Sequence, residues 1–536
     1  MEYLLIEGGK VWTGAGTVEE ALLLGGDKVI AVGSKSSVQS HPKAAKAKKI
    51  ALKGETVIPG MTDSHLHLTA VAKYKVAIDL SDVKSKEEFL QRIKKGAENS
   101  TPGSWVYASR LNEAHWDRPA LPTREDLDSL NLPNPIVVTR ICSHTNVVNT
   151  NALEKCGIPL DADIEGAVKG LDGKLNGILH EQAGFNVVEK MKKSLYTQER
   201  VTELVAEKCH EIAAYGLTAI HPCGAFSYGL EESLEVYQSL RAANRLSLRV
   251  FAYFDFMPNL PISSGLGDDW VKYQGWKTFL DGSLGAATAA FTEPYSDNPE
   301  SCGLLNHSLD EVKGWLEECQ SRGIQAQIHV IGDRALDQAL DAIEYVVSKR
   351  GTTSHSLPVR LAHTQLCRPD QIKRMASLRV VCDIQPMFLP SDMHMAPSRL
   401  GEKRLEMAYP WRSLYDGGLL LTGSSDTPAE SINPWTGVWA AVNRTGADGK
   451  PEEGWTPKEK LTLEQALKIY TVNPYKAMGY ENIGTLEVGK KADVVVLNND
   501  IWGMPTQKLK DVTPQYVFVD GLQSVGDLTD WPTISK

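Results

Sequence analysis

Eight short apolar segments recur between residues 56 and 426, and several are separated by stretches of helical composition. Strands that alternate with helices form parallel sheets, and eight such strands fit a closed barrel better than an open sheet. The pattern therefore predicts an α/β protein built on a (β/α)8 TIM barrel. We expect its strands at Thr56–Pro59 running into Asp63–His67, and at Thr218–Pro222, Leu248–Phe254, Trp276–Gly282, Ile324–Gly332, Val359–Gln365, Val380–Pro386 and Leu419–Asp426.

The two ends of the chain differ from its middle. Short β-type runs with Gly-rich turns fill the first segment, and similar runs recur near the other end. Residues 1–58 and 480–536 are therefore expected to form one composite β-sandwich domain, with the barrel domain at 59–479. Roughly 150 residues separate the first two barrel strands, far more than a strand–helix connection needs. We interpret residues 70–200 as an insertion that caps the active site.

Charge and hydropathy exclude several kinds of protein. The chain has 57 Lys and Arg against 67 Asp and Glu, a net charge of −10, which argues against a nucleic-acid partner. No run approaches the ~18 consecutive apolar residues of a membrane helix. The amino terminus lacks the pattern of a secretory signal, and the eight cysteines are scattered without a Cys-x-x-Cys pair. We expect a cytoplasmic protein with reduced thiols, and a homodimer on the general frequency of such assemblies.

His65 and His67 are the strongest local signal for chemistry. Two residues apart on an extended segment, both imidazoles lie on one face and can share a metal ion, although a pair of polar residues in a turn is the alternative. Further metal-ligating residue types stand near the ends of other predicted strands, namely Lys277, His329, His363 and Asp426. Because the carboxyl ends of barrel strands converge on one face, these side chains are expected to meet there.

The segments around these residues have distinctive sequences: Gly60–His67, Lys277–Gly285, His329–Ala335, His363–Gln365 and Gly423–Pro428. Together with Gly484–Asp493, they resemble the metal-dependent amidohydrolase superfamily and, within it, the third amidohydrolase family, which includes N-substituted formamide deformylases. The resemblance covers nearly the whole chain. It implies a TIM barrel, a β-sandwich built from both termini, and two divalent metal ions at the carboxyl face of the barrel.

The resemblance also implies a role for each candidate ligand. His65 and His67 would hold the first metal, and His329 and His363 the second. Asp426 would bind the first metal and act as the catalytic base. Lys277 matches the position of a lysine that carbon dioxide converts to a bridging carbamate; a structural salt bridge, with a single metal, is the alternative. Zinc suits the histidines, while manganese, cobalt and iron would also accept the oxygen ligands.

Five further residues are candidates for substrate binding or for positioning the ligands: His144, Glu181, His221, Asp281 and Asp333. The first two lie in the inserted segment and match family positions. His221 ends the second predicted strand, where a structural histidine is the alternative. The two aspartates each follow a predicted ligand by four positions and could orient it. For Asp333, a helix N-cap is an equally good interpretation.

The predicted function is that of a metal-dependent hydrolase that cleaves a C–N bond in an amide, an N-substituted formamide or a related small molecule. A hydroxide bridging the two metals would attack the carbonyl, with Asp426 as general base and then general acid. Two alternatives remain. An esterase or lactonase could use the same metal site, and a barrel that has lost catalysis could serve as a binding protein.

Overall fold

The computed structural model describes residues 2–535 except 69, 72–75, 99, 142, 143, 225–229 and 351–356. The chain divides into two compact units, one made of Met1–Leu68 with Ala206–Lys536 and the other of Thr69–Val205. Among the described residues, no helix combines the length and the apolar composition needed to cross a membrane. The described cysteines are free thiols, and Cys142 lies outside the described residues.

Eight parallel strands form the centre of the first unit and confirm the predicted TIM barrel. In spatial order they are β6 (Met61–Leu66), β13 (Leu217–Pro222), β14 (Arg249–Phe254), β16 (Val271–Phe279), β17 (Gln325–Val330), β18 (Arg360–His363), β19 (Val381–Ile384) and β20 (Leu420–Gly423). Hydrogen bonds just beyond the last strand bring it back to the first. The backbone N–H of Asp426 donates to His65 O at 2.8 Å, and that of His67 to Thr427 O at 2.9 Å.

The barrel strands are buried on both faces, which explains their continuous apolar runs. Every residue of β6, β13, β14, β17, β18 and β19 is buried. The register sets Lys277 opposite Gln327, and Val330 opposite His363. Polar side chains far apart in the sequence therefore share the barrel interior.

The first barrel strand begins later than the sequence pattern suggests. Thr56–Pro59 forms β5, which pairs with strands from both ends of the chain, and the barrel strand starts at Met61. Gly60 lies between the two strands. A Cβ there would meet the Thr218 hydroxyl at 2.0 Å, so the close approach of β13 requires a glycine.

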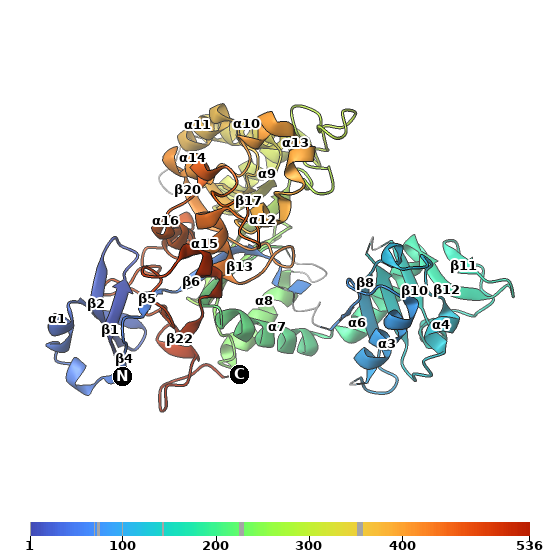
Figure 1. Ribbon diagram of the computed structural model, residues 1–536, viewed down its shortest axis with the longest axis horizontal. Coiled ribbons are helices and arrows are strands. Elements are labelled where there is room, and N and C mark those ends of the chain that lie inside the picture. The colour runs from blue at the N-terminus through green and yellow to red at the C-terminus, as the bar shows by residue number, and fades with distance from the viewer. Residues whose placement is uncertain are drawn as a thin grey trace. The chain divides into compact units, whose positions relative to one another are not determined.

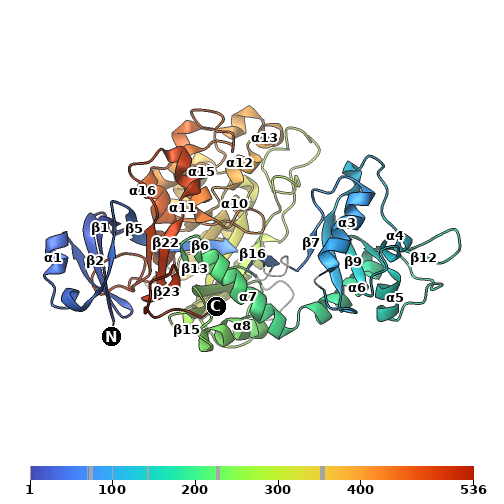
Figure 2. The ribbon, with the colours of Figure 1, turned by 60° about the horizontal axis from the view of Figure 1, so that its bottom comes forward.

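Helices surround the barrel strands, among them α8 (Leu230–Ala242), α10 (Asp333–Arg350) and α16 (Leu463–Tyr470) (Figure 2). Helix α9 begins with a capping box between Ser308 and Glu311 and ends at Gly323, whose φ of 64° suits a helix terminus. The longer helices of this unit are α8 (Leu230–Ala242), α9 (Leu309–Arg322), α10 (Asp333–Arg350), α11 (Pro369–Ser377), α13 (Ala396–Leu405), α15 (Pro434–Asn443) and α16 (Leu463–Tyr470). Shorter helices in the same unit are α1 (Lys35–Gln39), α12 (Phe388–Asp392), α14 (Trp411–Asp416) and α17 (Val472–Ala477). Helix α7 (Gln198–Ala213) begins in the second unit and ends in the first.

Both ends of the chain contribute to one eight-stranded sheet, in which blue amino-terminal strands lie near red β22 (Figure 1). Its strands are β1 (Tyr3–Trp12), β2 (Val18–Gly25), β3 (Lys28–Gly33), β4 (Lys48–Ala51), β5, β21 (Val494–Leu497), β22 (Pro514–Val519) and β23 (Leu522–Val525). Leu4 and Ile6 pack in one core with Val494 and Phe518, whereas Leu5 faces a separate core on the other side. This alternation is what the period of a strand dictates.

The second unit has its own six-stranded sheet, and the predicted insertion, residues 70–200, falls within it. The sheet contains β7 (Ile78–Asp79), β8 (Val106–Leu111), β9 (Ile136–Arg140), β10 (Thr145–Val148), β11 (Ala167–Lys169) and β12 (Leu175–His180). Phe89 and Ile93 of α3 (Lys86–Ala97) belong to one core, and Met191 of α6 (Glu181–Leu195) to another. The unit therefore packs helices against its sheet independently of the barrel core.

Candidate metal centre

Three predicted ligands meet at the end of β6. The ligand atoms of His65, His67 and Asp426 all lie within 4.8 Å of one another. Asp426 Oδ1 is 3.3 Å from His65 Nε2 and 3.2 Å from His67 Nε2. Two imidazoles and a carboxylate at this spacing form a possible site for one divalent metal ion.

The neighbours of these histidines determine which ring nitrogens face the site. His67 Nδ1 lies 2.7 Å from Cys223 O, so Nδ1–H donates to that carbonyl and Nε2 keeps its lone pair. Both ring nitrogens of His65 are buried and lack a hydrogen-bond partner among the described residues. Buried polar atoms are nearly always satisfied, so these nitrogens fit a metal ion.

His329 and His363 continue the cluster. The ring centroids of His65 and His363 are 5.5 Å apart, and those of His363 and His329 are 4.3 Å apart. His329 Nε2–H donates to Gly282 O at 3.0 Å, which leaves Nδ1 as the basic nitrogen of that ring. The four histidines of the sequence prediction therefore lie in one continuous group.

Lys277 lies at the same end of the barrel and is fully buried. Its Nζ is 5.1 Å from the centre of the Phe279 ring, which itself lies 5.3 Å from the His329 ring. Within the described residues, Nζ has no hydrogen-bond partner. The alternative of a structural salt bridge at Lys277 receives no support from these contacts, since no carboxylate in the described part of the chain pairs with it.

Burial keeps the nitrogen ligands neutral. It lowers the pKa of His65 and of His363 well below the usual value and lowers the pKa of His329 to about 4. Burial also lowers the pKa of Lys277. Metal ions bind the neutral imidazole, and carbon dioxide reacts with the neutral amine, so both shifts favour the expected chemistry.

Two buried carboxylates brace the backbone around the cluster. Asp63 Oδ1 accepts the N–H of His65 at 3.1 Å, and the Asp63 carboxylate accepts that of Ser425 at 3.2 Å. Asp281 accepts the N–H groups of Ile331 and Gly332 at 3.1 and 2.8 Å. Burial raises the pKa of both carboxyl groups to about 7. The sequence analysis named Asp281 but missed Asp63. The position of Asp63, two residues before the candidate ligand His65, could have indicated its role.

The backbone adopts the left-handed region at two candidate ligands. His363 has a φ of 77° and Asp426 a φ of 55°. Residues with side chains adopt this region rarely, and such strain concentrates at functional sites. His363 is the last residue of β18, and Asp426 lies three residues beyond the end of β20. Both unusual conformations therefore occur at the carboxyl ends of barrel strands.

Asp333 and His221, two further candidates from the sequence, form hydrogen bonds with residues other than the predicted metal ligands. Asp333 accepts the N–H of Thr292 at 2.9 Å and an Arg368 N–H at 2.8 Å, so it connects loops of the barrel. His221 is fully buried, and its Nδ1 accepts a hydrogen bond from Arg360 at 2.9 Å.

His144 and Glu181 both belong to the second unit. His144 Nδ1 and Glu181 Oε2 form an exposed pair 3.0 Å apart. The structure thus brings these two predicted residues together, and a substrate-binding role for them remains a prediction.

Phe388 was not anticipated from the sequence. Its half-buried ring stacks on His363, with centroids 5.6 Å apart and planes inclined by 25°. No local motif distinguishes this phenylalanine, because its contact depends on how α12 follows β19. It gives the candidate centre an apolar side.

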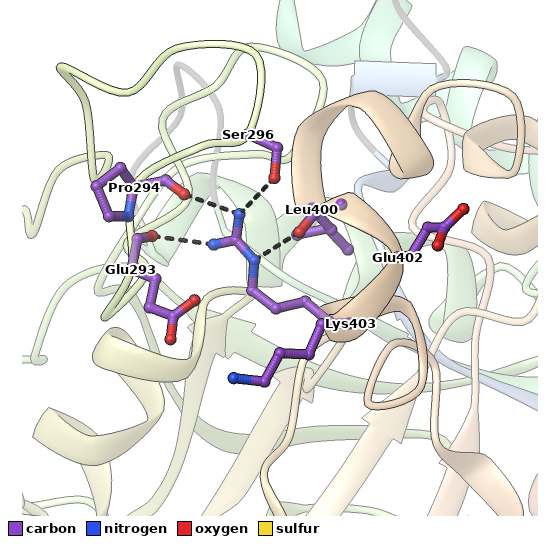
Figure 3. A pocket seen from close by; sticks show the side chains of 8 residues that line it. Glu293, Pro294, Ser296, Leu400, Glu402 and Lys403 are labelled. Atoms are coloured by element: carbon purple, nitrogen blue, oxygen red, sulfur yellow. Dashed lines mark hydrogen bonds between the residues drawn. The ribbon is translucent and has the colours of Figure 1, made fainter.

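A surface pocket of about 330 Å³ lies elsewhere in the first unit, between a loop and α13. The Arg404 guanidinium at its wall donates to backbone oxygens of Glu293, Pro294 and Leu400 and to the Ser296 hydroxyl (Figure 3). None of the six predicted metal ligands lines it. Arg404 is satisfied by the protein itself, so the pocket has the features of a packed loop junction.

A parallel barrel with histidines and an aspartate gathered at its strand ends is the scaffold of a metal-dependent hydrolase. The model of the amidohydrolase family matches residues 48–525, and the chain therefore belongs to this family. This confirms the resemblance found in the sequence and identifies the protein as an enzyme.

Individual relatives cover almost the whole chain. A putative amidohydrolase of Bacillus subtilis, YtcJ, is 28% identical over 95% of this chain and 94% of its own length. An N-substituted formamide deformylase of Arthrobacter pascens is 28% identical over 94% of each chain. The crystal structure of an uncharacterized metal-dependent hydrolase from Pyrococcus horikoshii is 28% identical, with a TM-score of 0.78 over 94% of this chain and 99% of that one.

Proposed function

We propose that this enzyme hydrolyses a C–N bond in an amide, an N-substituted formamide or a related small molecule, using two divalent metal ions. The observation that carries the proposal is the cluster of His65, His67 and Asp426, whose ligand atoms lie within 4.8 Å of one another. The unpartnered Lys277 Nζ, buried at the same end of the barrel, adds a second potential ligand group. The relative named N-substituted formamide deformylase supports the substrate class.

The residues present fit two metal ions. His65, His67 and Asp426 would hold the first, and His329 through Nδ1 together with His363 would hold the second. A carbamate on Lys277 would offer one anionic oxygen to each, which a neutral amine cannot do. When bound, divalent ions of this kind acidify water and polarise a carbonyl group. Zinc suits the imidazole-rich set, with manganese, cobalt and iron as alternatives.

Asp426 is the group that moves the proton. Its side chain is 14% exposed and that of His67 is 12% exposed, whereas His65 is 1% exposed and Lys277 fully buried. His329 is 11% exposed as well. A substrate therefore reaches the cluster on the side formed by Asp426, His67 and His329. There the carboxylate accepts a proton from the attacking water and returns it to the departing nitrogen.

The first experiment is elemental analysis of protein purified without a chelator, followed by kinetics on matched formamides and formate esters. About two metal equivalents per chain and faster hydrolysis of the formamides are the expected results. A preference for the esters would contradict the assignment of the bond. Near-zero metal that zinc and bicarbonate do not restore, with no hydrolysis, would contradict the proposal as a whole.

The proposal also includes a small-molecule substrate as partner, without nucleic acid or membrane, a cytoplasmic location and a homodimeric assembly. Gel filtration with light scattering tests the assembly. A monomer would contradict that part and leave the chemistry untouched.

A further inference from the structure

A fully buried ion pair lies in the barrel interior on the same strands that carry the candidate ligands. Arg360 of β18 and Asp383 of β19 are both 0% exposed, and their charged groups are 2.9 Å apart. An arginine and an aspartate without solvent are retained only where further hydrogen bonds compensate for their lost hydration. The contacts of this pair show what it does.

Arg360 uses its whole guanidinium group. Its Nε and one terminal nitrogen donate to Asp383, and the same terminal nitrogen donates to Ser64 O at 3.0 Å. The other terminal nitrogen donates to Tyr253 Oη at 2.6 Å and to His221 Nδ1 at 2.9 Å. A guanidinium has five N–H donors in a fixed planar fork, so these contacts fix the positions of several strands relative to one another.

Asp383 extends the network to the other side of the barrel. It accepts a hydrogen bond from Gln327 Nε2 at 2.7 Å and another from the Thr422 hydroxyl. Gln327 Oε1 in turn accepts from Cys223 Sγ at 2.8 Å. Strands β6, β13, β14, β17, β18, β19 and β20 are therefore connected through side chains as well as through backbone pairing.

Five members of this network are close in sequence to candidate ligands. Ser64 immediately precedes His65, and the Cys223 carbonyl accepts the Nδ1–H of His67. In the same way, Gln327 comes two residues before His329, Arg360 three before His363, and Thr422 four before Asp426. Through Ser64, Gln327 and Thr422, and through Arg360 itself, the pair thus contacts or belongs to the strands that carry or precede His65, His67, His329, His363 and Asp426.

We propose that the Arg360–Asp383 pair is a positioning element of the metal centre, which sets the spacing of ligands on different strands so that their affinity for the metal depends on it. The inference rests on the metal centre of the proposed function. Backbone pairing alone fixes each strand relative to its two neighbours. The guanidinium adds cross-barrel contacts from β18 to β6 and β13, which the backbone ladder cannot supply.

Electrostatics explains why the arginine needs its partner. A lone guanidinium buried near the site would repel a divalent cation, and in a water-excluded interior this repulsion is screened only weakly. Asp383 neutralises that charge while both groups keep their hydrogen bonds. The pair therefore positions the strands without adding net charge next to the candidate ligands.

The chain supplies a matched control. Arg249 donates to both oxygens of Asp493 at 2.8 Å, and these residues are 1% and 3% exposed. This second buried pair connects β14 with the terminal sheet. Arg249 also donates to Asp520 at 2.9 Å, and Asp520 keeps Lys491 as a second partner at 3.0 Å. The Arg249–Asp493 pair has none of the contacts beside the candidate ligands, so it separates a positioning effect from a general loss of stability.

The test compares Co²⁺ binding by the wild type, by the double variant Arg360→Gln with Asp383→Asn, and by the control Arg249→Gln with Asp493→Asn. Both substitutions in each pair keep polar groups and remove the charges together. We expect the first double variant to lose about 10- to 100-fold in Co²⁺ affinity and to change the visible spectrum of the bound ion. The control should melt at a lower temperature but keep the affinity and the spectrum of the wild type.

A milder variant covers the case in which the double variant does not fold. Thr422→Val removes one hydrogen bond to Asp383 and keeps the shape of the side chain. We expect it to fold and to bind Co²⁺ several-fold more weakly. Wild-type affinity and spectrum in the double variant, or in Thr422→Val where only that variant folds, would overturn the inference alone. A wild type that binds no Co²⁺ would overturn the proposed function and, with it, this inference.

Discussion

The candidate centre has two halves that are built differently. In the first, His65, His67 and Asp426 already place their ligand atoms within 4.8 Å of one another. In the second, the His329 Nε2–H donates a hydrogen bond to Gly282 O. The second half, which also contains His363 and Lys277, has no carboxylate among its predicted ligands, and Lys277 has no hydrogen-bond partner in the part of the chain that the structure describes.

The difference is one of charge. The Asp426 carboxylate gives the first half a negative charge that can bind a cation without any covalent modification of the chain. The proposed ligands of the second half are neutral nitrogens, and under the proposed function a carbamate formed on Lys277 by carbon dioxide would supply the missing negative oxygens. We therefore expect the first half to bind metal by itself and the second to depend on bicarbonate.

The largest expected effect comes from the first half. Asp426→Asn removes the proposed proton carrier but keeps an oxygen that could bind the metal. Turnover should fall about 10³-fold, within the range that a positioned acid–base group contributes. Most of the metal should remain. Steady-state kinetics and elemental analysis of the same preparation check this, and a rate close to that of the wild type would refute the assignment of Asp426.

Lys277→Met tests the second half. The side chain keeps a similar length in its fully buried site but cannot form a carbamate. We expect one metal equivalent in place of two and turnover reduced roughly 100-fold, which corresponds to about 2.7 kcal/mol of lost transition-state stabilisation.

Lys272→Met on the same strand is the control, because Lys272 donates to Gly265 O and is not a predicted ligand. It should keep both metals. Two metal equivalents in Lys277→Met would show that the halves do not differ in the way proposed.

The ligands of the two halves could be predicted from the sequence, but by different arguments. His65 and His67 could be paired from their spacing, since a strand places alternate residues on one face. The convergence of His329, His363 and Asp426 followed from the barrel itself, because parallel strands end on one face. The barrel strands were found because strands buried on both faces give continuous apolar runs.

The supporting contacts could not be predicted. Asp63 accepts the N–H of Ser425, which is 362 positions away, and Arg360 donates to Ser64 O across 296 positions. Such contacts depend on register and side-chain conformation, which no local pattern encodes. A distant contact also explains why the first barrel strand was predicted to begin too early. Thr56–Pro59 joins the terminal sheet because Val57 and Ile58 pair with Val496 and Val495.

Paired substitutions of the two bracing carboxylates test the halves against each other. Asp63→Asn places an amide where the N–H groups of His65 and Ser425 donate, and Asp281→Asn does the same beside Ile331 and Gly332. Each change should weaken one metal about tenfold, as is usual for residues that orient ligands. Asp63→Asn should affect the first metal and Asp281→Asn the second. Equal weakening of both metals by either variant would show that the centre responds as one unit.

Phe388 gives the smallest expected effect and concerns the substrate side of the second half. Its ring stacks on His363 at 5.6 Å and is half-buried, so a substrate that reaches this metal would contact it. Phe388→Leu should raise KM about threefold with little change in kcat, because one aromatic contact is worth roughly 0.5–1.5 kcal/mol. Met387→Leu, a non-aromatic change at the neighbouring position, should leave KM unchanged. A fall in metal content with Phe388→Leu would instead mean that the ring holds His363 in place and belongs to the support of the second half.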